Sequence, residues 1–135
     1  IDIRNTEGLN KIFDNNNLDA VIHLSGLKAV SESVILPLEY YSSNVSGSVS
    51  LFKVMQAHNV KKIVFSSSAT VYGNPQYLPI DEDHPLQGQS PYSASKASSD
   101  HLVNAWYNTY NFPTITTNCS NNFGPYQFPE NIIRL

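Results

Sequence analysis

Several features that narrow the class of a protein are scarce or missing in this sequence. It contains one cysteine, Cys119, which excludes an internal disulfide and a cysteine-based metal cluster. No stretch approaches the roughly 20 apolar residues that a membrane span requires. Charged residues make up only 14% of the chain, the net charge is −3, and lysine and arginine form no run. These absences argue against a membrane, a nucleic acid or a metal as a partner, and they favour the reducing cytoplasm.

Glycine is also sparse, and its positions matter. The chain has 6 glycines, too scattered to form a Gly-x-Gly-x-x-Gly or Gly-x-x-Gly-x-x-Gly turn. Such a turn places the pyrophosphate of a dinucleotide at a helix N-terminus. A dinucleotide site formed by this sequence alone would therefore lack its first turn.

The apolar residues that are present, 41% of the chain, alternate between helical spacing and short continuous runs. Helical spacing predicts helices over 6–17, 37–58 and 91–110, and β-branched or apolar runs predict strands over 19–24, 62–68 and 114–119. Thr6 is the expected cap of the first helix, with Leu9, Ile12 and Phe13 as its buried stripe. Strands that alternate with amphipathic helices predict an α/β fold with a parallel sheet and right-handed crossovers.

Small polar residues lie at the carboxyl ends of all three predicted strands. These residues are Ser25-Gly26, Ser66-Ser67-Ser68 and Ser120-Asn121-Asn122. Ligands of parallel sheets bind beyond the carboxyl ends of the strands, so these residues are expected to converge on one crevice. His23, inside the first strand, is expected to be a hydrogen-bonded core residue. The Pro-, Gly- and Gln-rich segment 73–90 is predicted to be a long loop.

Tyr92 and Lys96 are the residues most suited to chemistry. They lie four positions apart at the start of a predicted helix, and therefore on one face. One ammonium about 4 Å from a phenol contributes roughly the 4 kcal/mol needed to ionise it near neutral pH. The alternative is an ordinary surface pair. Ser68, at the end of a buried strand, favours the chemical interpretation because its hydroxyl would hydrogen-bond an oxygen that Tyr92 deprotonates.

Longer segments carry a specific resemblance. Phe65-Ser-Ser-Ser-Ala-Thr-Val-Tyr-Gly73 and Ser90-Pro-Tyr-Ser-Ala-Ser-Lys96 resemble an extended short-chain dehydrogenase/reductase. Val21–Val30, Pro37–Tyr41 and Asn44-Val45 resemble its UDP-glucose 4-epimerase branch, whereas Cys119–Glu130 is similar to its dTDP-glucose 4,6-dehydratase branch. The resemblance implies a partial Rossmann-type doubly wound parallel sheet that lacks its first βαβ unit. Residues 1–119 would be a partial NAD-binding domain, and 120–135 the start of a substrate-domain region, within an internal fragment of a homodimeric parent.

The resemblance also implies roles for individual residues. Tyr92 would be the base toward the sugar 4-hydroxyl, Lys96 would bind the nicotinamide ribose, and Ser68 would hold the sugar oxygen. The implied NAD-binding positions are Asp2, Ile3, Leu24, Ser25, Gly26, Leu27, Lys28, Ser43, Ser68, Tyr92, Lys96 and Ser120. The implied positions for the nucleotide sugar are Ser68, Tyr92 and Asn121. Ser43 departs from the family pattern, because the epimerase branch usually has a cofactor-contacting Asn there.

Two residues separate the candidate reactions. A 4,6-dehydratase needs an extra acid and base, and the family dehydratase carries an Asp-Glu pair directly after its catalytic hydroxyl residue. Here Ala69 and Thr70 occupy those positions, and neither side chain transfers a proton near neutral pH. We therefore expect epimerisation at C4 of UDP-glucose or UDP-galactose through a 4-keto intermediate. A dehydratase, or an inactive truncated product, is the alternative.

Overall fold

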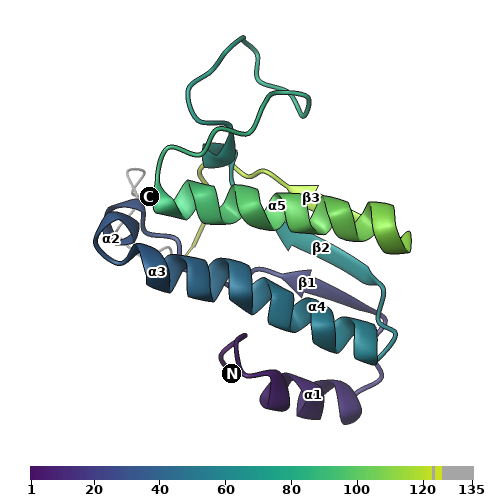
Figure 1. Ribbon diagram of the computed structural model, residues 1–135. Coiled ribbons are helices and arrows are strands. Elements are labelled where there is room, and N and C mark those ends of the chain that lie inside the picture. The colour runs from purple at the N-terminus through teal and green to yellow at the C-terminus, as the bar shows by residue number, and fades with distance from the viewer. Residues whose placement is uncertain (123, 126–135) are drawn as a thin grey trace.

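The computed structural model describes residues 1–122, 124 and 125, and it shows a three-stranded parallel sheet with helices along one face (Figure 1). The elements in chain order are α1 (Thr6–Asp14), β1 (Ala20–His23), α2 (Val30–Ile35), α3 (Pro37–Tyr40), a π-helical turn (Tyr41–Ser46), α4 (Gly47–Ala57), β2 (Lys62–Ser66), a 3₁₀ turn (Ala69–Tyr72), α5 (Pro91–Tyr110) and β3 (Thr114–Thr117). The predicted α/β class and all three predicted strands are confirmed. Part of the predicted substrate-domain region, residues 126–135, lies outside the described residues.

The strands follow the order β1-β2-β3, and each neighbouring pair is parallel. Helices α4 and α5, which connect them, lie over the same face of the sheet, as two right-handed crossovers require (Figure 1). His23 and Phe65 pair in register and are buried. The next row, Ile22, Val64 and Ile115, points the other way, and Ile22 and Ile115 are 68% and 60% exposed. The helices therefore cover one face of the sheet in the described chain.

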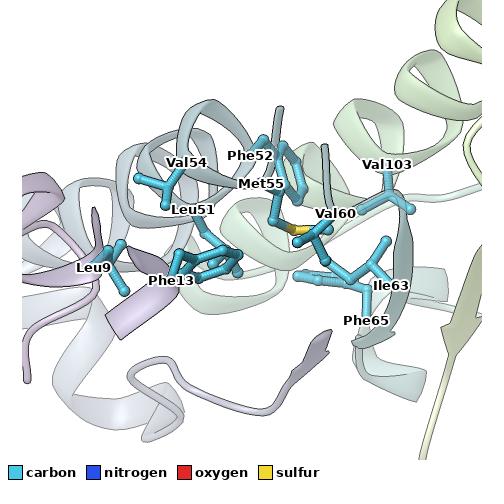
Figure 2. Packing of buried hydrophobic residues seen from close by; sticks show 10 residues of the cluster. All are labelled: Leu9, Phe13, Leu51, Phe52, Val54, Met55, Val60, Ile63, Phe65 and Val103. Atoms are coloured by element: carbon cyan, nitrogen blue, oxygen red, sulfur yellow. The ribbon is translucent and has the colours of Figure 1, made fainter. Parts of the chain in front are cut away.

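The apolar core lies between the sheet and the helices α1, α4 and α5 (Figure 2). Its buried members are Leu9, Phe13, Leu51, Phe52, Val54, Met55, Val60, Ile63, Phe65 and Val103. The prediction that Ile12 belongs to the buried stripe of α1 is wrong, because this side chain is 40% exposed. The short helix packs chiefly against α4, and Leu9 and Phe13 are its buried residues.

The cap of α1 also differs from the prediction. Asn5, not Thr6, is the N-cap, and its side-chain oxygen accepts a hydrogen bond from the Gly8 amide at 2.9 Å. Asparagine and threonine are both good capping residues, so two adjacent candidates leave the boundary uncertain by one position in a sequence.

The predicted helix over 37–58 is not a regular α-helix. It is interrupted by the π-helical turn Tyr41–Ser46, and the separate helix α2 precedes it. The irregular backbone is compensated by side chains, since the carbonyl of Asn44 accepts from the hydroxyls of Ser48 at 2.6 Å and Ser99 at 3.1 Å. Apolar periodicity does not reveal such a turn, because it depends on polar groups of two distant helices.

The predicted loop 73–90 contains no helix or strand between Gly73 and Gln89. It is ordered around His84, which is buried and contacts the rings of Tyr72 and Tyr77. The Nε2 atom of His84 accepts from the Gln76 amide at 2.9 Å, and Nδ1 lies 2.9 Å from the carbonyl of Pro85.

None of the helices in the described part of the chain has both the length and the apolar character that a membrane span requires.

The core predicts a large difference between two adjacent substitutions in α4. Met55 is fully buried, so Met55→Ala is expected to lower the free energy of unfolding by about 2–5 kcal/mol, because it leaves a cavity. Gln56 is exposed, and Gln56→Ala is expected to change this free energy by less than about 0.5 kcal/mol. Urea denaturation of the three proteins measures both values. Equal effects of the two substitutions would contradict the assignment of Met55 to the core.

Candidate functional site

A cleft of about 860 Å³ opens at the carboxyl ends of the strands. Its lining comes from the segment after β1, the segment after β2, the first turns of α5 and the segment after β3. The lining residues are Leu24, Gly26, Leu27, Lys28, Ala29, Val30, Ser31, Ser66, Ser67, Ser68, Thr70, Tyr92, Lys96, Cys119, Ser120, Asn121 and Asn122. The predicted convergence of three polar strand ends on one crevice is confirmed.

The start of α5 sets the position of Tyr92. Ser90 caps the helix and forms a capping box with Ser93. Pro91 occupies the first turn, where its missing N–H removes no hydrogen bond within the helix. Tyr92 is 9% exposed and lines the cleft, and its ring meets the ring of Tyr40 edge-on at 6.4 Å. The phenol is thus held between a fixed helix end and a second aromatic ring.

Lys96 lies one turn further along α5 and lines the same cleft. Its Nζ atom donates to the carbonyl of Ser66 at 2.6 Å and lies 5.0 Å from the centre of the Phe65 ring. Burial lowers the pKa of Lys96, and the negative charge of Asp100 opposes that change. The predicted common face of Tyr92 and Lys96 is confirmed, since both residues line the same cleft.

Ser68 lies two residues after the end of β2 and is the third residue predicted to carry chemistry. It caps the 3₁₀ turn, and its hydroxyl oxygen accepts from the Thr70 amide at 3.3 Å and lies 3.0 Å from the Thr70 hydroxyl. The side chain lines the cleft together with Tyr92 and Lys96. The structure brings the three predicted residues into one cavity, whereas their chemical roles stay predictions.

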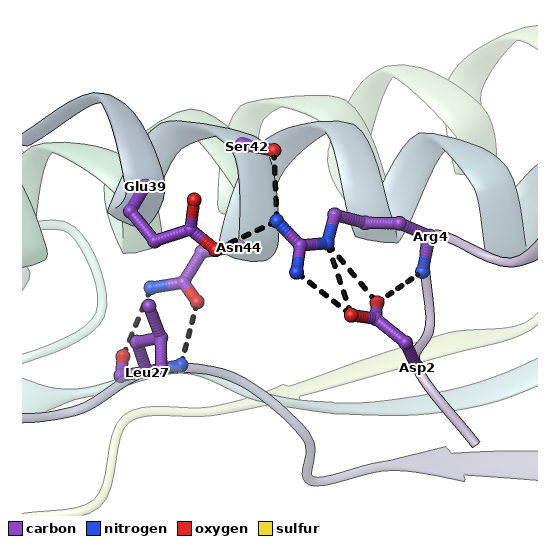
Figure 3. A network of polar contacts seen from close by, with 6 residues as sticks. All are labelled: Asp2, Arg4, Leu27, Glu39, Ser42 and Asn44. Atoms are coloured by element: carbon purple, nitrogen blue, oxygen red, sulfur yellow. Dashed lines mark hydrogen bonds and ion pairs between the residues drawn. The ribbon is translucent and has the colours of Figure 1, made fainter.

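Asn44 clamps the segment that follows β1 (Figure 3). Its Oδ1 accepts from the Leu27 amide at 2.8 Å, and its Nδ2 donates to the Leu27 carbonyl at 3.0 Å and to the Ser95 hydroxyl at 2.9 Å. A Cβ atom on Gly26 would lie only 2.9 Å from that Oδ1. Gly26 is therefore needed for the close approach of this segment to the π-helical turn.

Tyr40 anchors the next part of the cleft wall. Its ring is fully buried, and its hydroxyl lies 2.8 Å from the carbonyl of Ala29 and 2.7 Å from Oε2 of Glu32. Burial, aided by the Glu32 carboxylate, raises the pKa of Tyr40 to about 12. The phenol therefore remains a hydrogen-bond donor and fixes the segment of the cleft wall around Ala29.

Sequence reasoning missed the anchoring roles of Tyr40, Asn44 and Asp100. Each is a polar residue on the buried side of a helix. Asp100 carried a usable signal, because it lies one helical turn beyond Lys96 and in line with it. The contacts of Tyr40 and Asn44 depend on the path of the chain after β1, for which the sequence has no local signal.

The prediction that His23 is a hydrogen-bonded core residue is confirmed. Its ring is 5% exposed, with Nε2 at 3.1 Å from the Ser48 hydroxyl and Nδ1 at 3.2 Å from the Ser25 hydroxyl. Burial, with a smaller contribution from the charge of Lys96, lowers the pKa of His23 to about 4. A neutral imidazole therefore lies beneath the cleft at neutral pH.

The residues predicted to bind NAD divide into two groups. The first group lines the cleft and consists of Leu24, Gly26, Leu27, Lys28, Ser68, Tyr92, Lys96 and Ser120. The cleft is also lined by Asn121, which was predicted to bind the nucleotide sugar. The second group is not among the described residues that line the cleft, and it consists of Asp2, Ile3, Ser25 and Ser43. Ser25 instead contacts His23 through its hydroxyl, and Ser43 lies half-buried in the π-helical turn.

Asp2 and Ile3 lie below α4 rather than at the cleft. The Asp2 carboxylate accepts from the Arg4 guanidinium, with the shortest distance 2.7 Å, and Arg4 also bonds Glu39 at 2.7 Å (Figure 3). The hydrogen bonds from Arg4 lower the pKa of Asp2 to about 2. Ile3 lies against Gly47. Their contacts to a cofactor stay predictions.

Comparison with known proteins identifies relatives of this arrangement. The family described as GDP-mannose 4,6 dehydratase matches residues 1–135. A UDP-glucose 4-epimerase from Bos taurus is 51% identical over 104 residues, which are 76% of this chain and 30% of the relative. The chain thus spans about 30% of the length of the curated relatives that it matches.

Solved structures are similar as well. The UDP-glucose 4-epimerase from Bifidobacterium longum, in complex with NAD+ and UDP, is 43% identical with a TM-score of 0.83, and the match covers 87% of this chain and 36% of that one. A double mutant of the dTDP-glucose 4,6-dehydratase DesIV from Streptomyces venezuelae, with NAD bound, is 34% identical with a TM-score of 0.90, covering 98% of this chain and 41% of that one. Epimerases and dehydratases therefore share this fold.

The lowered pKa of His23 predicts a pH-dependent stability. The folded chain disfavours the imidazolium, so the unfolded chain binds the extra proton, and stability is lost as the pH falls from 6.5 toward about 4. This loss is expected to reach about 3 kcal/mol. His23→Gln is expected to remove this component, whereas His101→Gln, at an exposed position, is expected to retain it. Urea denaturation at pH 7 and pH 4 measures the difference, and an equal pH dependence of wild type and His23→Gln would contradict it.

Proposed function

The chain belongs to the GDP-mannose 4,6 dehydratase family, and from this membership we propose that the protein carrying it is an NAD-dependent nucleotide-sugar epimerase. The reaction would invert C4 of UDP-glucose or UDP-galactose through a 4-keto intermediate. The observation that carries the proposal is the presence of Tyr92, Lys96 and Ser68 in one cleft at the carboxyl ends of the strands.

Each of the three residues has a part that its surroundings support. Tyr92 takes the proton of the sugar 4-hydroxyl, because it combines an ionisable oxygen with a position inside the cleft. Lys96 supplies the positive charge that favours the ionised phenol, and the Ser66 carbonyl holds its ammonium in place. Ser68 donates its hydroxyl hydrogen to the sugar oxygen, because that hydroxyl already accepts from the Thr70 amide.

The described residues fit part of a dinucleotide. The residues Leu24, Gly26, Leu27 and Lys28 line the cleft, at the carboxyl end of β1, where parallel sheets bind dinucleotides. Lys96, at the base of the cleft, suits a contact to ribose hydroxyls. When bound, NAD supplies the hydride acceptor for the oxidation of C4. The proposed residues toward it remain Asp2, Ile3, Leu24, Ser25, Gly26, Leu27, Lys28, Ser43, Ser68, Tyr92, Lys96 and Ser120, with Asn121 toward the sugar nucleotide.

Epimerisation is favoured over dehydration by the turn after β2. Ala69 and Thr70 begin this turn, and the Thr70 hydroxyl lines the cleft beside Ser68. Loss of water from C5 and C6 needs an additional acid and base, and neither a methyl group nor an aliphatic hydroxyl serves near neutral pH. An epimerase needs only a ketone that can turn over and accept hydride on its other face.

A 4,6-dehydratase is the second candidate, because the segment Cys119–Glu130 resembles that branch. Structural coverage does not separate the two reactions, since the matches to DesIV and to a UDP-glucose 4-epimerase from Thermus thermophilus each cover 98% of this chain. An inactive product is the third candidate. We also propose that the longer protein is a cytoplasmic homodimer, for which the exposed rings of Tyr107 and Tyr110 on α5 offer apolar surface.

The test of the proposed function uses the longest reading frame that contains this chain. Incubation with UDP-galactose and catalytic NAD is expected to give the C4 epimer, identified by nuclear magnetic resonance of the sugar. A 4-keto-6-deoxy sugar from dTDP-glucose would instead establish the dehydratase, and no turnover with either substrate would establish an inactive product.

Removal of one hydroxyl tests the proposed base. Tyr92→Phe is expected to reduce kcat by about 10²–10⁴-fold, because proton transfer in the transition state contributes that range. Tyr107→Phe, on the exposed side of the same helix, is expected to leave kcat unchanged. Comparable kcat values for Tyr92→Phe and Tyr107→Phe would contradict the role of Tyr92.

A further inference from the structure

A second ionisable residue of α5 is buried next to the proposed site. Asp100 is only 2% exposed and lies one helical turn beyond Lys96. Its Oδ2 accepts from the Ser67 hydroxyl at 2.7 Å, whereas its Oδ1 is buried without a hydrogen-bond partner among the described residues. A buried carboxyl with one unsatisfied oxygen costs stability, so its presence at this position calls for a reason.

We propose that Asp100 is a positioning residue for the reaction, which holds the end of β2 through Ser67 and supplies the buried negative charge that keeps Lys96 cationic beside Tyr92. This inference rests on the proposed function for its catalytic consequence. Its structural and electrostatic parts concern only the contacts among residues of this chain.

The geometry joins Ser66, the last residue of β2, and Ser67, the residue after it, to two residues of α5. Lys96 donates to the backbone carbonyl of Ser66, and Asp100 accepts from the side chain of Ser67. Two residues one helical turn apart on α5 therefore bond two successive residues of the chain. Ser68 is the next residue after Ser67, so a shift of Ser68 along α5 would break both bonds. The pair of bonds thus fixes the distance of Ser68 from the helix that carries Tyr92.

The electrostatic relation between the two α5 residues is mutual. Burial raises the pKa of Asp100 to about 6, and the Ser67 hydrogen bond and the charge of Lys96 oppose that rise. Burial lowers the pKa of Lys96, and Asp100 opposes that fall. The charged form of each residue therefore favours the charged form of the other. Above pH about 6 the carboxylate is present, and it extends the range over which Lys96 remains protonated.

Other titratable groups near this pair behave differently. His101 on α5 is exposed, and its positive form would favour the Asp100 carboxylate. His23 on β1 senses Lys96, but its pKa of about 4 leaves it neutral over the relevant range. On the adjoining wall, Tyr40 remains a neutral phenol with a pKa of about 12, hydrogen-bonded to the Glu32 carboxylate. Asp100 is thus the acid whose charge bears on Lys96 within the described residues.

The direct test follows the titration of Lys96 by nuclear magnetic resonance in the protein that carries this chain, labelled with ¹³C at lysine Cε. Asp100→Asn retains an acceptor for Ser67 and removes only the charge. It is expected to move the Lys96 titration to lower pH, because the negative charge that opposes the effect of burial is lost. Asp19→Asn, at an exposed position before β1, is the matched control and is expected to leave the titration unchanged. An unmoved Lys96 titration in Asp100→Asn would overturn the proposal.

Two further variants separate charge from folding. Ser67→Ala retains the charge and removes the hydrogen bond, so the Asp100 titration, followed at Cγ, is expected to move to higher pH. Asp100→Glu restores a carboxylate, and it is expected to return the Lys96 titration toward its wild-type position. If Asp100→Asn alone failed to fold, these two variants would still decide the proposal, since an unmoved Asp100 titration in Ser67→Ala, or a Lys96 titration that moves to lower pH in Asp100→Glu, would overturn it.

The catalytic consequence has a separate readout. If the protein is an active epimerase, the alkaline limb of kcat/KM in Asp100→Asn is expected to begin at lower pH than in wild type, because Lys96 loses its proton earlier. A uniform loss at every pH, with the limb unmoved, would overturn the positioning role. If the protein has no activity, the proposed function fails, and the Lys96 titration still tests the link between Asp100 and Lys96.

Discussion

A buried ammonium at the carboxyl end of β2 determines which residues can surround it. Moving a charged lysine out of water is expensive unless hydrogen bonds or opposite charge compensate for the lost solvation. Lys96 has the carbonyl of Ser66, the face of the Phe65 ring and, one turn away, the carboxyl of Asp100. These partners explain why a buried strand ends in serines and why a helix that packs on the sheet carries charge on its inner face.

The interface between α5 and the π-helical turn is correspondingly polar. Asn44, Ser48, Ser95 and Ser99 are all buried there, and their side chains bond one another or nearby carbonyls. Small hydroxyl side chains allow the two helices to approach closely, and directional hydrogen bonds then fix one alignment. The apolar cluster around Phe52, Met55 and Val103, at the other end of these helices, contributes burial without such direction. One end of these helices thus contributes mainly to stability, whereas the hydrogen bonds at the other end position the residues around the cleft.

The sequence was sufficient to predict the α/β class, the three strands, the helix that carries Tyr92 and Lys96, and the convergence of the polar strand ends on one cleft. These features follow from periodicity and from the geometry of parallel sheets, which act over short stretches or in every such fold. It was insufficient for helix α2, the π-helical turn and the exposed position of Ile12. Those depend on how distant elements pack, and local propensity does not determine packing.

The same contrast between local features and contacts of distant elements applies to the site. Lys96 could be placed beside Tyr92 because four residues make about one helical turn. The bond from Lys96 to the Ser66 carbonyl, the clamp by Asn44 and the anchor by Tyr40 could not be placed, because their partners lie 11 to 51 residues away. The family resemblance directed attention to the reacting groups. The supporting residues became visible only in three dimensions.

The π-helical turn between α3 and α4 has a consequence for insertions and deletions. The i→i+5 hydrogen bonds of a π-helical turn enclose one residue more than those of an α-helix, so this turn already holds an extra residue. Tyr40, before the turn, is aligned with the cleft, and Phe52 and Met55, after it, are aligned with the core. Loss of one residue there would be absorbed by a return to α-helical bonding, whereas a further residue would rotate everything after the turn by about 100° relative to everything before it. The backbone of this short segment therefore accepts a deletion more readily than an insertion.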